Sequence, residues 1–117
     1  MRLELLQNGI LVATYRRRTQ VTLEAAREIV SMRLDFAGLD PRPVLIYNQG
    51  VVHFDKQARR YVSSGDGILG IKAAAVIDNH PFTHLIMSYI VSVERPAIPA
   101  RTFINPEGAM RWLLTFL

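Results

Sequence analysis

The chain has 117 residues, of which 50% are apolar and 21% charged, with a formal net charge of +4 and no cysteine. This length predicts a single domain over residues 1–117, and the composition excludes a disordered polar chain. Without cysteine there are no disulfides, thiolate nucleophiles or cysteine metal sites, which fits a cytoplasmic protein. The apolar runs are too short to predict a transmembrane segment or a signal peptide.

The N-terminal segment is predicted to form a β-hairpin. Alternating apolar residues lie on both sides of Asn8-Gly9, and this dipeptide favours a two-residue turn because both positions tolerate positive φ. From Thr22 the apolar residues recur at three- and four-residue spacing. This spacing predicts an amphipathic helix with Thr22 as its N-cap and Gly38 as its end.

A cluster of positive charge, Arg16-Arg17-Arg18, lies between the hairpin and this helix. One interpretation is a solvated loop, and the other is contact with an anion or an acidic surface. Aromatic residues that would stack on nucleic-acid bases are missing around the cluster, apart from Tyr15. We therefore expect no specific binding of nucleic acid.

The rest of the chain is predicted to alternate strands with helices. Buried strands are expected at Val44–Tyr47 and Ile71–Ile77, because both are continuous apolar runs. Later elements are a helix that begins at Pro81, a strand at Arg101–Ile104, and a final helix capped by Asn105. The order ββαβαβαβα predicts an α/β fold with a five-stranded, mainly parallel sheet, an antiparallel N-terminal hairpin and about four helices.

Several segments carry a family resemblance in addition to the element order. They are Pro43–Ile46, Gly50-Val51, Gln57–Arg59, Gly70–Val76 and Ala109–Leu113. Together they resemble small, stand-alone bacterial STAS-like proteins, which have the SpoIIaa-like fold of anti-sigma-factor antagonists and are related in shape to the lipid-binding SEC14 domain. The resemblance implies a non-enzymatic, regulatory protein-interaction module.

Asp55 occupies the position that is regulated in antagonists of that family. There, a serine or threonine at the start of the helix after the central strand is phosphorylated by a partner kinase. Asp55 cannot accept a phosphate, although a carboxylate can cap a helix that ends at Ser63 and interact with its dipole. The nearby Ser63-Ser64-Gly65 lies at the end of this helix and lacks the preceding aspartate of the family's phosphorylation motif. The phosphorylation switch is therefore not expected here.

Polar residues follow three of the predicted strands at their carboxyl ends, where open α/β sheets bind ligands. These candidate ligand-facing residues are Tyr47, Asn48, Gln49, Asp78, Asn79, His80 and Asn105. The alternative is that they only cap the following helices. As a hydrolase, the site would offer an acid–base pair of His80 and Asp78. His80 and His84 have the spacing of metal ligands, but a site needs three or four ligands, so we expect no metal and no cofactor.

Two hypotheses for function follow. The first is a non-enzymatic STAS-like interaction module with an unidentified protein partner, which forms a homodimer through a helix face bearing Met87 and Val91. The second is a small-ligand or lipid-binding domain of SEC14-like shape. A lipid needs a pocket on the order of several hundred Å³, so the size of any cavity distinguishes the two.

Overall fold

The computed structural model describes residues 1–15, 19–49, 51–78, 88, 92 and 97–117. Its main sheet has five strands in the order β1-β2-β4-β6-β7. The strands are β1 (Arg2–Leu5), β2 (Leu11–Tyr15), β4 (Arg42–Asn48), β6 (Ile71–Ile77) and β7 (Ala100–Phe103). The β1–β2 pair is antiparallel and the other three neighbouring pairs are parallel. The predicted α/β fold with a mainly parallel sheet is confirmed.

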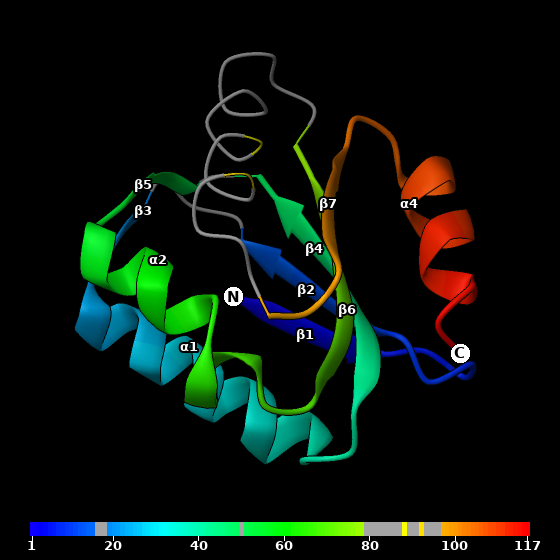
Figure 1. Ribbon diagram of the computed structural model, residues 1–117, viewed down its shortest axis with the longest axis horizontal. Coiled ribbons are helices and arrows are strands. Elements are labelled where there is room, and N and C mark those ends of the chain that lie inside the picture. Colours follow the sequence, from blue (N-terminus) through cyan, green and yellow to red (C-terminus); the bar gives the residue numbers. More distant parts are fainter. Residues whose placement is uncertain (16–18, 50, 79–87, 89–91, 93–96) are drawn as a thin grey trace.

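Helices cover both faces of this sheet (Figure 1). On one side lie α1 (Leu23–Ala37), α2 (Lys56–Val62) and the 3₁₀ helix η1 (Gly65–Ile68), and on the other lies α4 (Pro106–Leu114). The described residues thus include three α-helices. The helix predicted from Pro81 falls outside them except for Ser88 and Ser92, which are both helical. The hydroxyl oxygens of Ser88 and Thr102 of β7 lie 2.9 Å apart, within hydrogen-bonding distance.

The ends of α1 agree with the sequence. The Thr22 hydroxyl accepts a hydrogen bond from the backbone N–H of Ala25 at 3.2 Å, which satisfies one of the free donors of the first turn. Gly38 ends the helix with a φ of 79°, and its N–H donates to the Leu34 carbonyl. Such a backbone conformation favours glycine, because a Cβ would be strained there.

The hairpin turn differs from the prediction by one residue. The backbone N–H of Leu6 donates to the Ile10 carbonyl, and that of Gly9 donates to the Leu6 carbonyl. The turn therefore has three residues, Gln7, Asn8 and Gly9, and Gly9 takes the left-handed position with a φ of 94°. The Asn8 side chain accepts a hydrogen bond from the Ile10 N–H at 3.0 Å, which favours this longer turn over the two-residue form.

A second, two-stranded parallel sheet was not predicted. It pairs β3 (Thr19–Val21) with β5 (Val51–Phe54). Each strand has only three or four residues, and the partners are about thirty residues apart in the chain. Local patterns cannot reveal such a pairing, since it depends on how α1 returns the chain to the sheet.

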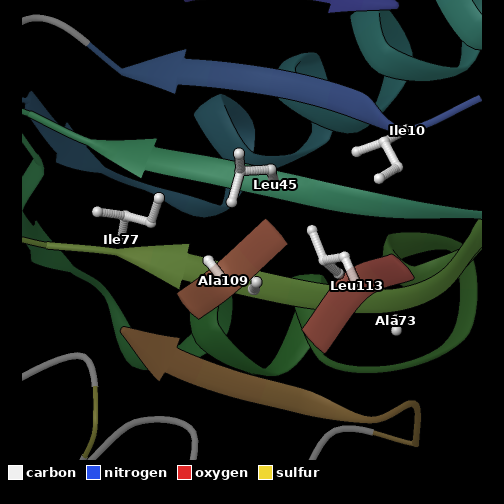
Figure 2. Close-up of a cluster of buried hydrophobic side chains, with 7 residues drawn as sticks. Ile10, Leu45, Ala73, Ile77, Ala109 and Leu113 are labelled. Atoms are coloured by element: carbon white, nitrogen blue, oxygen red, sulfur yellow. The ribbon is translucent and has the colours of Figure 1, made fainter. Parts of the chain in front are cut away.

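The core on the α4 side is a cluster of buried apolar side chains. Its buried members are Ile10, Leu45, Ala73, Ala75, Ile77, Ala109 and Leu113. Figure 2 shows α4, which carries Ala109 and Leu113, lying over β4 and β6. Small side chains at Ala73 and Ala75, both 0% exposed, let the helix approach the sheet closely. The ring of Trp112 completes this layer, with centroids 5.8 Å from Phe103 and 4.9 Å from Phe116.

Candidate functional site

The opposite face of the sheet is less completely filled. A cavity of about 140 Å³ lies between the sheet and the layer formed by α1, α2 and η1. Its sheet side includes the apolar residues Leu3, Ala13, Val44, Ile46, Ala74 and Val76, and its helix side includes Ile29, Val30 and Val62. The cavity is therefore lined mainly by hydrocarbon.

Small residues on this face explain why the space is left open. Ala74 is the parallel neighbour of Val44 on one side and of Ala100 on the other, and all three line the cavity. Ala13 of β2 adds another short side chain. On the α4 side the small alanine side chains let a helix lie close to the sheet. On this side they leave a hollow, because the inward-facing side of α1 also carries an arginine.

That arginine is Arg33, which is only 7% exposed. Its two terminal nitrogens donate to backbone carbonyls, Nη1 to Leu69 at 2.6 Å and Nη2 to Gly67 at 3.0 Å. Arg33 forms no ion pair with a carboxylate in the part of the chain that the structure describes. Burial lowers the pKa of Arg33, because removal from water disfavours the charged form.

Gly67 is required for this arrangement. A Cβ at this position would collide with the backbone carbonyl of Tyr61, at the end of α2. Glycine lets η1 pass directly beneath that helix. The turn then presents the carbonyls of Gly67 and Leu69 to Arg33.

Tyr15 is the second polar group on the cavity wall. Burial raises the pKa of its phenol to about 12, and the positive charge of Arg33 opposes this rise only in part. The hydroxyl is therefore protonated at neutral pH and can donate a hydrogen bond. Among the described residues, Tyr15 Oη has no hydrogen-bond partner.

The structure brings together two of the residues predicted at the strand ends. Asn48 lines the cavity, and its side-chain nitrogen donates to Asp78 Oδ2 at 3.0 Å. Asp78 is 2% exposed, so this carboxylate is held inside the protein at the carboxyl end of β6.

The other predicted strand-end residues lie apart from this pair. Tyr47 packs against the core on the α4 side, and Gln49 is exposed. Asn105 caps α4, since its side-chain oxygen accepts from the Gly108 N–H at 3.0 Å. Asn79 and His80 are outside the described residues, as are Met87, Val91, His84 and the cluster Arg16-Arg17-Arg18.

Asp55 stands at the N-cap position of α2, as predicted, but its side chain makes no capping hydrogen bond. Instead, Asp55 Oδ1 accepts from Gln20 Nε2 at 3.2 Å. Gln20 belongs to β3, whose pairing with β5 brings it beside the start of α2. The predicted side-chain cap is wrong because this unpredicted strand supplies a competing donor.

The sequence interpretation missed Arg33 and Tyr15. A signal for Arg33 was present, because Ala26, Val30 and Ala37 recur along the inward stripe of α1 and position 33 falls on the same stripe. A charged residue at an inward position of an amphipathic helix marks a buried polar site. Tyr15 carried no comparable signal, because alternation in β2 does not show which face has a cavity.

In the described ranges of the chain, no cluster of three or more histidine, aspartate or glutamate side chains is suited to a metal ion. Within the same residues, none of the helices has the length and apolar character needed to cross a bilayer.

A protein-family model, "Domain of unknown function (DUF7793)", matches residues 4–117. The chain belongs to the DUF7793 family. No curated protein matches this DUF7793 chain.

The DUF7793 chain is similar to two solved structures. One is an uncharacterised protein of the DUF3478 family with a SpoIIAA-like fold from Shewanella loihica PV-4, at 14% identity and a TM-score of 0.55, covering 96% of this chain and 90% of the other. The second is a protein of unknown function from Arthrobacter sp. FB24, at 19% identity and a TM-score of 0.37, covering 97% and 98%. The first likeness shows a SpoIIAA-like fold, as the STAS-like resemblance implied.

Proposed function

We propose that this DUF7793 chain binds a small apolar molecule in the cavity between its sheet and the α1–α2 layer, without catalysing a reaction. The supporting observation is the cavity itself, with a volume of about 140 Å³ and a largely hydrocarbon lining. A ligand that enters it removes apolar surface of the lining from water, which contributes about 25 cal/mol per Å² covered.

The size of the cavity limits the ligand. An engineered cavity of about 150 Å³ takes up benzene, whereas pockets for drug-sized ligands measure about 300–1,000 Å³. A membrane lipid is larger than this space. The lipid-binding alternative therefore narrows to a ligand with roughly the bulk of one aromatic ring.

Toluene is a suitable probe, because it is apolar and of the right size. In methyl NMR spectra of the protein, saturable shifts are expected for Val44 and Val76, which line the cavity. Leu113 serves as the internal control, since it is buried on the α4 side of the sheet. Unchanged Val44 and Val76 signals at saturating toluene would refute the proposal.

A second candidate function is the STAS-like interaction module, a regulatory homodimer in the cytoplasm. The observation that favours it is a row of large apolar side chains on the outside of α1 and just beyond it, Met32, Phe36 and Leu39, each about half exposed or more. A twofold dimer needs only one such row, because the surface packs against its own copy. Sedimentation should then report a dimer that Phe36→Glu converts to a monomer. A monomeric wild-type protein over a wide range of concentration would exclude it.

A further inference from the structure

Arg33 is a buried cation for which the described part of the chain supplies only neutral acceptors. The carbonyls of Gly67 and Leu69 bind it, but neither carries a formal charge. Removing a charge from water is costly unless an opposite charge is paired with it. Folding has already removed most of the water around Arg33. Binding of an anion would therefore cost little further desolvation of this cation.

The guanidinium also has hydrogen-bonding capacity to spare. It carries five N–H donors, of which the carbonyls of Leu69 and Gly67 use two, so three remain. Arg33 lines the cavity. A planar guanidinium is suited to bind a carboxylate through two parallel hydrogen bonds.

Tyr15 supplies a further donor on the same cavity wall. Its protonated hydroxyl can donate to an anion but cannot repel it by charge. The rest of the lining is mainly hydrocarbon, with valines and alanines on the sheet side. Asn48 and Ser63 add neutral polar groups to the lining, so Arg33 is the one charged side chain among the described lining residues. A single positive charge matches a singly charged ligand better than a phosphate dianion.

We infer that the ligand of the cavity is a small apolar carboxylic acid, such as an aromatic or branched-chain acid. Its carboxylate binds Arg33 and the Tyr15 hydroxyl, and its hydrocarbon part lies against Val44, Ala74 and Val76. This inference rests on the proposed function, because it assigns the chemical class of the molecule that the cavity binds.

Three probes of similar size test the charge and the cavity separately. Benzoate carries the carboxylate, benzamide has nearly the same shape without the charge, and toluene has only the hydrocarbon part. Dissociation constants come from methyl NMR titrations of the wild-type protein at pH 7. Benzoate is expected to bind at least about tenfold more tightly than benzamide, as for other hydrogen bonds between charged groups.

Two variants assign this preference to residues. Tyr15→Phe is expected to fold normally, because the hydroxyl has no partner among the described residues, and to weaken benzoate binding about threefold to tenfold while toluene binding is retained. Arg33→Met is expected to abolish the preference for benzoate over benzamide. If Arg33→Met fails to fold after losing its two carbonyl bonds, Tyr15→Phe alone decides the question.

The outcomes separate the two claims. If toluene binds but benzoate binds no more tightly than benzamide, the carboxylate inference is overturned and the apolar cavity still stands as a binding site. An unchanged benzoate affinity in Tyr15→Phe also overturns the inference. If none of the three probes binds, the proposed function itself fails.

Discussion

Ala74 and Ala75 are neighbours in β6 whose enlargement should have opposite effects. Ala74 lines the cavity, whereas Ala75 is 0% exposed and packs in the core beneath α4. Ala74→Leu is expected to stabilise the protein because its added carbons enter empty space. Ala75→Leu is the matched control, with the same change in volume on the filled side of the same strand.

The expected magnitude follows from the three added carbons. Burial contributes about 0.8 kcal/mol for each, or about 2.4 kcal/mol in all. Fixing the leucine side chain costs about 0.5–1 kcal/mol of this gain. The net increase in the free energy of unfolding is therefore about 1.5 kcal/mol. Overpacking at Ala75 is expected to lower it by about 1–3 kcal/mol.

Urea unfolding measures both changes. Trp112 is the single tryptophan and packs between Phe103 and Phe116, so its fluorescence should report loss of the core. With a urea dependence of about 2 kcal/mol per M, Ala74→Leu should raise the midpoint by about 0.7 M. It should also abolish toluene binding. Equal destabilisation by both variants would refute the presence of an open cavity beside Ala74.

Three further predictions concern the supports of the site. Because the pKa of Tyr15 is raised from 10.0 to about 12, the unfolded chain loses this proton first as pH rises, so stability present below pH 10 should fall by about 1.4 kcal/mol by pH 11. The urea midpoint of Tyr15→Phe should therefore fall less between pH 10 and pH 11 than that of the wild-type protein. An equal fall in both proteins would contradict the assignment of this pH dependence to Tyr15. Gly67→Ala should lower the thermal midpoint, with a loss of about 2 kcal/mol or more from collision with Tyr61; an unchanged midpoint would show that η1 can move aside. Asn105→Ala should cost about 1 kcal/mol through loss of the α4 cap, and Asn105→Asp should retain most of this in the same urea assay, whereas an equal loss would count against the capping role.

The fold was largely predictable because its main elements have strong local signals. Thr22 and Gly38 bound α1 as predicted, and Ile71–Ile77 forms a buried strand with the predicted limits. The β3–β5 pair was not predictable, since its two short segments are joined only by tertiary contacts. The same pair explains the error at Asp55, whose side chain binds Gln20 and makes no capping hydrogen bond to α2.

The candidate site was only partly predictable. Asn48 and Asp78, two of the polar residues expected at the strand ends, lie together in the structure, because the carboxyl ends of parallel neighbouring strands lie at one edge of the sheet. Their role in facing a ligand stays a prediction. The cavity depends instead on which face of β6 the side chain of Ala74 occupies and on how closely α1 can approach. A run of three alanines at 73–75 indicates that a helix could pack closely on either face of the sheet. In the structure a helix packs closely on the α4 face, and the cavity lies on the other face.

A crystal structure of the protein grown with benzoate would test the central claim most directly. We expect electron density for the aromatic ring between the sheet and α1, with the carboxylate within hydrogen-bonding distance of Arg33 and the Tyr15 hydroxyl. If the cavity remained without benzoate at saturating concentration, or protein side chains filled it, the proposed binding function would be contradicted. If the ring were bound with its carboxylate turned away from Arg33, the assignment of the ligand class would be wrong while the cavity remained a binding site.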